Sequence, residues 1–327
     1  MAKNNNLTDF LTSLANKFRS KLRMRTPINP QNFDTMVDNV YTQGSTDLVN
    51  PQTRNGTDFG YFFYGSIGNS TYLPPRYYTT TLPSIDTSKG TNFNYMFGRL
   101  ERLLEVPQID TSKGTTFSGM FSSCRKITTI PYIDTSNGTY FNSMFINCVS
   151  LTSIPNLNVA NGTNFAYMFR NCPKLTAVPA LNTSKGTDFS HMFMSCTNLK
   201  SIGGLNTSNG TNFLNMFSGC SSLVTAPTLN VSNATTLSGI FGGCTALKNI
   251  AFTGTIGANI SLSGAPSLTL NSLKNVINVL GDFSGTETTH ILTLHANHKQ
   301  LLSNAGSTAP GGITWVQYAN NKGWTVD

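Results

Sequence analysis

Charged residues are scarce in this chain, and acidic ones most of all. Only 11% of the 327 residues are charged, with 14 Asp and Glu against 22 Lys and Arg and a formal net charge of +8. An average soluble domain has about 25% charged residues. Thr, Ser and Asn take their place here. This composition is unusual for an enzyme and typical of an extended surface protein.

Other signals are missing as well. No apolar run approaches the roughly 20 residues of a transmembrane helix. The first 18 residues contain Asp9 and Lys17 and lack an uninterrupted apolar stretch, so we do not expect a signal peptide. The chain has no phosphate-binding glycine loop, no G-x-S-x-G and no H-E-x-x-H. We therefore expect no enzymatic activity and no cofactor.

What the chain does have is a repeat of 24 residues. Seven units run from Asp86 to Thr253 without an insertion, and each contains a form of the pattern G-T-x-F-x-x-M-F-x-x-C. A unit of this size cannot bury its own apolar face, but stacked units can. The sequence therefore predicts a solenoid, with about 4.8 Å between successive coils if they pair as strands do.

Two periodicities predict the structure of each unit. The apolar positions of F-x-x-M-F-x-x-C recur at i, i+3, i+4 and i+7, which indicates one face of a short helix. The following aliphatic stretch, such as Leu151–Leu157, is typical of a short strand whose Pro leaves a gap in its ladder. Equivalent positions should form ladders, with Phe, Met, Cys and Leu inside and Thr, Ser and Asn outside. The Asp or Asn before each Thr-Ser should cap a turn.

The pattern D-T-S-x-G-T-x-F-x-x-M-F-x-x-C-x-x-L resembles the leucine-rich repeats of the bacterial-surface-protein (BspA-like) family. The resemblance covers Asp86 to Thr253 and implies an α/β repeat solenoid. Members of that family are secreted or lipid-anchored adhesins. We see neither a signal sequence nor a lipobox Cys in this chain, which leaves the export route open.

An atypical capping repeat is expected over residues 46–85. A degenerate unit around Phe59 aligns with the first full unit at an offset of 34, which leaves room for an aromatic insertion. The tyrosines of this insertion either close the end of the core or form a sugar- or protein-binding patch. Its candidate ligand residues are Tyr72, Tyr77 and Tyr78.

Residues 254–327 should form a small α/β cap. The pattern predicts a helix over 270–281, a strand over 290–294, a short helix near Lys299 and a strand around 324–326. The segment resembles the C-terminal ends of repeat-bearing proteins of tailed phages and prophages.

Residues 1–45 predict a helical anchor with an amphipathic and strongly basic first helix. The segments N-L-T-D-F-L and P-I-N-P-Q-N-F resemble the opening of structural proteins of tailed bacteriophages, which implies attachment of this end to a virion. A solvated helix face and binding to DNA phosphates are the alternatives, although no base-reading motif is present. The docking candidates are Leu7, Phe10, Leu11, Leu14, Phe18, Leu22, Arg19, Arg23 and Arg25.

Cysteine and histidine are the candidate metal ligands. All six cysteines occupy one repeat position, so their side chains should point the same way into the core as free thiols, and converging metal ligands are not expected. His290, His295 and His298 are spaced H-x4-H-x2-H, but no further ligand type accompanies them. We interpret them, and His191, as surface residues rather than a metal site.

The exposed ladders are the remaining candidate for function. Thr128, Thr152, Thr176 and Tyr132 lie at variable positions of the aliphatic half and could bind a glycan or another chain, or serve solubility alone. The leading hypothesis is a non-enzymatic phage virion protein, of fibre or decoration type, that docks on other virion proteins through residues 1–45. Its repeats would attach to the host or to mucus by contacting a host-surface glycan or protein. A bacterial adhesin exported non-classically is the alternative, and a glycan hydrolase is a weaker third. We expect no nucleic acid partner and no membrane insertion, and self-association stays open.

Overall fold

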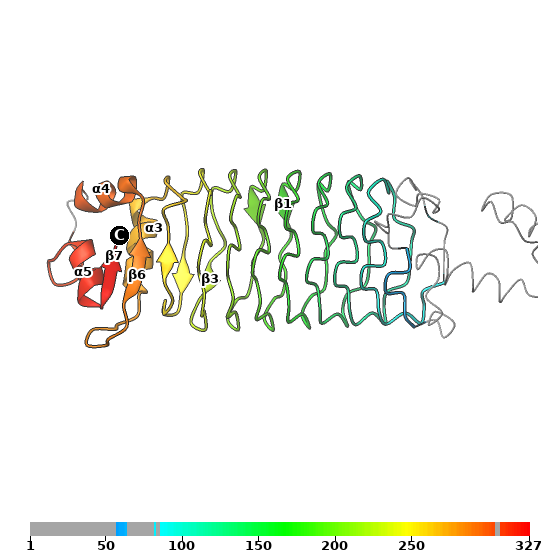
Figure 1. The fold of residues 1–327 in the computed structure, drawn as a ribbon, viewed down its shortest axis with the longest axis horizontal. Helices are drawn as coiled ribbons and strands as arrows, with labels where there is room; N and C mark the ends of the chain where they lie inside the picture. The colour runs from blue at the N-terminus through cyan, green and yellow to red at the C-terminus, as the bar shows by residue number, and fades with distance from the viewer. Residues whose placement is uncertain (1–56, 64–81, 83–85, 305–307) are drawn as a thin grey trace, which may run out of the picture.

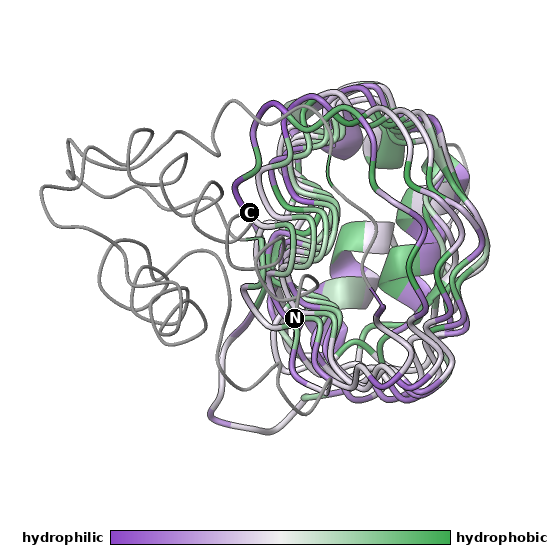
Figure 2. Ribbon diagram, turned by 90° about the vertical axis from the view of Figure 1, so that its right-hand side faces the viewer, coloured by the Kyte–Doolittle hydropathy of each residue, from purple (hydrophilic) through white to green (hydrophobic). Residues whose placement is uncertain are grey.

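The structure is a computed structural model that describes residues 57–63, 82, 86–304 and 308–327. The coils stack side by side along one axis (Figure 1). Viewed end-on, successive coils superpose, so that stripes of similar hydropathy run along the stack (Figure 2). The predicted repeat solenoid is confirmed. The expected anchor over 1–45, and most of the atypical repeat over 46–85, lie outside the described residues.

A ladder of parallel bridges joins the coils at the residue before each first Phe. Its members are Asp58, Asn92, Thr116, Tyr140, Asn164, Asp188, Asn212 and Thr236. The pairing of Asp58 with Asn92 confirms the degenerate unit at the longer offset. At the other end, Leu229 pairs with Phe252, so the last coil is one residue shorter than the others.

The F-x-x-M-F-x-x-C stretch is a run of tight turns, and the helix predicted there is wrong. In the first full unit the N–H groups of Met96, Gly98 and Leu100 donate to carbonyls three residues earlier. Tyr95 and Arg99 have φ values of 52° and 60°, in the left-handed region. A residue in this region prevents the chain from continuing as a right-handed helix. The N–H groups of the residues between them, such as Tyr95 and Phe97, donate instead to carbonyl oxygens of the next coil.

Regular strands are few in the aliphatic half. They are β1 (Ala177–Val178) with β2 (Ser201–Ile202), and β3 (Leu229–Asn230) with β4 (Phe252–Thr253), each pair parallel. The prolines explain the gaps, because they lack the N–H that would extend the ladder. Where the fifth unit has Gly203 instead, its N–H donates to the carbonyl of Val178 in the preceding coil at 2.8 Å.

The core consists of the side chains that the periodicity placed inside. Phe93, Met96, Phe97 and Leu100 are fully buried, as are their equivalents along the array. Two rows of phenylalanine rings run through it, and within the array successive rings are nearly parallel with centroids 5.4 to 5.8 Å apart. The core is therefore continuous from coil to coil, as expected of a solenoid.

The C-terminal part continues the stack and adds three helices (Figure 1). A parallel sheet of order β5-β6-β7 comprises β5 (Ile260–Ser261), β6 (His290–Thr293) and β7 (Trp324–Val326). The helices α3 (Leu270–Asn278), α4 (Ala296–Asn304) and α5 (Trp315–Asn321) pack against one another. The helix and strand positions predicted for this part agree with these elements. Among the described residues, no helix has the length and apolar character needed to cross a bilayer.

Candidate functional site

One face of the solenoid carries three adjacent exposed ladders, which we call the strand-side face. Every member is exposed to solvent. The first ladder holds Thr128, Thr152, Thr176, Lys200 and Val224, the second Thr129, Ser153, Ala177, Ser201 and Thr225, and the third Tyr132, Asn156, Ala180, Gly204 and Thr228. The structure thus brings the predicted candidates Thr128, Thr152, Thr176 and Tyr132 together on one surface.

The backbone behind this face is held in register. Both the N–H and the Oγ1 of Thr152 donate to the carbonyl of Thr128, at 2.9 and 3.0 Å. Ile130 and Ile154, which follow in the chain, are buried and anchor the segment to the core. Because the Thr152 hydroxyl proton is engaged with the backbone, its oxygen presents free lone pairs to solvent.

The strand-side face is uncharged over three consecutive coils. From Thr128 to Ala180 it carries hydroxyl, amide, methyl and phenol groups only. Charged side chains appear at Glu105 on one side of this stretch and at Lys200 on the other. Tyr132 is 64% exposed, the most of any large hydrophobic or aromatic side chain among the described residues.

The Asp and Asn ladder is structural, as predicted. Asp86 and Asp110 each accept a hydrogen bond from the backbone N–H two residues later, at 3.0 and 2.9 Å. These hydrogen bonds, from Ser88 and Ser112, hold the pKa of both carboxyls below the usual value. The four asparagines further along the array make the same contact. These carboxylates stabilise turns and are not arranged as an acid–base pair.

A ladder of buried threonines was missed by the sequence prediction, which placed all Thr outside. Thr87 is 2% exposed, and its Oγ1 donates to the carbonyl of Asp110 in the next coil at 2.7 Å. The N–H of Asp110 returns a bond to the same oxygen at 2.8 Å. The side chain thereby satisfies two backbone groups at once. The recurrence of Thr directly after the turn-capping Asp was the available signal.

The six cysteines are free and buried, as predicted. Each Sγ lies within 3.0 to 3.1 Å of a Phe carbonyl in the preceding coil, as Cys124 does with Phe97. Burial raises the pKa of Cys196 and of Cys244 to about 12. A protonated thiol is a poor nucleophile and a poor metal ligand, so this ladder is suited to packing rather than chemistry.

The histidines correct a prediction. His298 is fully buried instead of lying on the surface, and burial lowers its pKa. His191 is half-buried, with its ring stacked on Tyr167 at 4.5 Å between centroids, and His290 stacks on Phe283 at 3.7 Å. Within the described part of the chain, no three His, Cys, Asp or Glu side chains are placed to hold a metal ion.

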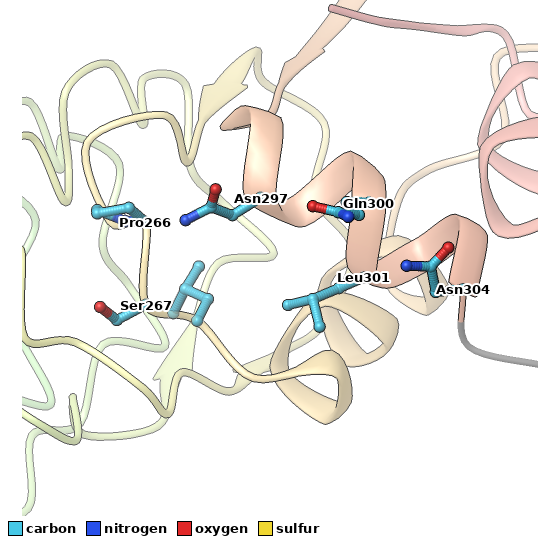
Figure 3. A pocket seen from close by; sticks show the side chains of 7 residues that line it. Pro266, Ser267, Asn297, Gln300, Leu301 and Asn304 are labelled. Carbon is cyan, nitrogen blue, oxygen red and sulfur yellow. The ribbon is translucent and has the colours of Figure 1, made fainter.

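An open pocket of about 460 Å³ lies in the C-terminal part. One wall is the segment Pro266–Leu268, and the other is a face of α4 formed by Asn297, Gln300, Leu301 and Asn304 (Figure 3). The lining is a mixture of carboxamides, the Ser267 hydroxyl and apolar groups, without a charged side chain. Nothing in the sequence pattern had indicated it.

The remaining predicted site residues lie outside the described residues. They are the tyrosines of the insertion, Tyr72, Tyr77 and Tyr78, and the docking candidates Leu7, Phe10, Leu11, Leu14, Phe18, Leu22, Arg19, Arg23 and Arg25.

Comparisons with known proteins bear on the repeats. No curated protein matches the sequence. A leucine-rich repeat protein of known structure from Bacteroides ovatus ATCC 8483 is similar at 16% identity with a TM-score of 0.26. The match covers 73% of this chain and 64% of that protein, so the chain spans under two thirds of its length.

A family model described as "Mycoplasma protein of unknown function, DUF285" matches three overlapping stretches, 31–150, 74–179 and 152–253. Together they include the whole array and more than half of the chain. The structure accounts for this multiple match, because each stretch spans several stacked coils of the same kind. The chain therefore belongs to the DUF285 family.

Proposed function

We propose that this chain is a non-enzymatic binding protein that uses the strand-side face for many weak contacts with a cell or mucus surface. One observation carries the proposal: over three consecutive coils, from Thr128 to Ala180, this face exposes hydroxyl, amide, phenol and methyl groups and no charge. Hydrogen bonds between coils fix these groups in register. A ligand that extends along the axis would meet a threonine in each of these three coils, at Thr128, Thr152 and Thr176.

The chemistry of this face suits neutral, hydrogen-bonding partners such as a glycan or an extended peptide. The Asn156 amide both donates and accepts, and the Thr and Ser hydroxyls offer acceptor oxygens, as Thr152 does while its proton is bound to the carbonyl of Thr128. Tyr132 adds a large contact area with a polar tip. Single contacts of this kind are weak, but repetition along a coil array and over many copies raises the effective concentration of binding groups.

We further propose a tailed-phage virion as the setting, with residues 1–45 docked on other virion proteins. The support is the sequence alone: the resemblance of the first segments and the basic amphipathic helix. A bacterial cell surface is the alternative setting, in which the same face would act as an adhesin.

Three substitutions on the strand-side face test the binding role. The variant T128E/T152E/T176E places carboxylates in the neutral stretch and should abolish binding to immobilised mucin and to a panel of neutral polysaccharides. The control T197E/N198E/T245E adds the same charge at other exposed positions and should bind normally. Equal loss in both variants, or none in either, would contradict the proposal.

Deletion of residues 1–45 tests the setting. A virion protein should lose incorporation into particles and retain mucin binding by its repeats. Unchanged incorporation would exclude docking through this segment and would leave the adhesin setting as the better account.

A further inference from the structure

Two histidines cap the N-terminus of α4. His295 lies directly before the helix, and its Nδ1 accepts a hydrogen bond from the backbone N–H of Asn297 at 3.1 Å. In return, the backbone N–H of His295 donates to Nδ1 of His298 at 3.2 Å. This reciprocal arrangement resembles a capping box, with imidazoles in the places usually held by Ser or Thr and by Glu or Gln, except that His295 accepts from the second residue of the helix rather than the third.

His298 also fastens α4 to the turn that precedes α3. Its ring is fully buried, and Nε2 lies 2.9 Å from the carbonyl oxygen of Ala265. Because a carbonyl can only accept, Nε2 carries the proton, and Nδ1 must be the bare acceptor for the N–H of His295. The two partners together require the neutral form of the ring.

Few ionisable groups surround these two histidines. On the elements packed against α4 they are Lys274 of α3 and Tyr318 of α5, and α4 itself adds Lys299. The backbone oxygen of Asp327 accepts from the N–H of Leu294, next to His295, at 2.7 Å. None of the three helices contains a carboxylate. A positive charge here would also lie at the positive end of the helix dipole. Burial lowers the pKa of His298, and the nearby His295 adds to this effect.

We propose that His298, held by His295, is a pH-sensitive latch, and that its protonation releases the first turn of α4 from Ala265 and loosens the C-terminal end of the solenoid. The pocket in Figure 3 lies on this joint. Pro266 follows Ala265 on one wall, and Asn297 lies in the first turn of α4 on the other. Release would separate the walls and uncover the buried side chain of Leu302.

The direction of the pH effect follows from the lowered pKa of His298. Above the ordinary histidine pKa of about 6.5 the ring is neutral whether or not α4 is docked, so docking carries no penalty. As the pH falls below that value the undocked form takes up the proton first. Docking is therefore weakened progressively until the pH passes the lowered pKa of the docked form.

Hydrogen exchange of the full-length protein tests this inference. We would compare peptides from 296–304 with peptides from the coil 134–157 at about pH 7.5 and about pH 5, after correction for intrinsic exchange. Protection of α4 should fall by about tenfold or more relative to the coil, because the undocked form takes up the proton before the docked form does. The variant H295S/H298Q recreates a pH-insensitive Ser-x-x-Gln capping box, and its α4 should stay protected at both pH values.

The variant His191→Asn is a further control. It introduces the residue found one coil later at Asn215, and its α4 should lose protection in acid as the wild type does. Wild-type protein whose α4 keeps its protection at about pH 5 overturns the latch, whatever the variants do. An equal acid effect in wild type and in H295S/H298Q overturns it too. If the double variant is already unprotected at about pH 7.5, H298Q alone takes its place and should show a smaller acid effect than the wild type.

Discussion

Gly162 shows at the scale of single residues how closely the coils pack. A Cβ at this position would lie 2.5 Å from Cζ of Phe165 and 2.9 Å from Cδ2 of Phe141 in the preceding coil. Glycine is therefore needed to admit both rings. In the seventh coil the pair changes together: Ala234 stands in the glycine position and Leu237 in that of the Phe. The smaller Leu makes room for the extra methyl group.

Gly162→Ala should consequently destabilise the solenoid by about 1–3 kcal/mol through overpacking. The measurement is a urea titration followed by circular dichroism. The double variant G162A/F165L, which copies the seventh coil, should recover part of the loss. Gly204→Ala serves as the control, since a Cβ there meets nothing within 4 Å. Equal stability of G162A and G204A would contradict this account of ring packing.

At the scale of elements, the period predicted which side chains face inward but not the backbone that carries them. Phe93, Met96 and Phe97 are buried as the helical spacing required. A run of turns with a left-handed residue at every fourth position buries the same side chains as a helix would. The spacing of the apolar residues alone could therefore not distinguish the two backbones. The distinguishing signal was the frequent Gly, Asn and Ser at the positions of Tyr95 and Arg99 in later coils.

The repeat also determined which parts of the candidate site could be predicted from the sequence. Thr128, Thr152 and Tyr132 could be assigned to an exposed face because the repeat fixes which side of the coil they share. His298 could not be placed, because its burial depends on contact with Ala265, far away in the chain and outside any repeat. Sequence periodicity therefore predicted the array well and the C-terminal contacts poorly.

Ser195 tests the turn geometry. Its φ is 62°, and glycine occupies the equivalent positions in the next two coils, at Gly219 and Gly243. Ser195→Val should cost about 1–2 kcal/mol, because a β-branched side chain is strained in the left-handed region. Ser195→Gly should leave stability nearly unchanged or raise it slightly. Thermal unfolding of the two variants checks this, and a Val variant as stable as the Gly variant would argue for a different backbone.

At the scale of the whole molecule, the protein is a stack in which each coil contributes both to the core and to the exposed face. The Phe rows and the bridge ladder make stability a property of neighbouring coils. In the proposed function, binding by the strand-side face depends on how many neutral coils follow one another. Whole coils can therefore be deleted without shifting the repeat, and such deletions separate the effect on stability from the effect on binding.

The most direct test of the account is the binding of mucin by two such deletions. Removing residues 134–181 takes out two coils of the neutral stretch, whereas removing 182–229 takes out two coils that carry Lys200 and Val224. Both proteins should fold. The account predicts a loss of avidity of at least about tenfold for the first deletion only, because multivalent binding depends steeply on the number of contacts. Full binding by the first deletion, or equal loss in both, would contradict it.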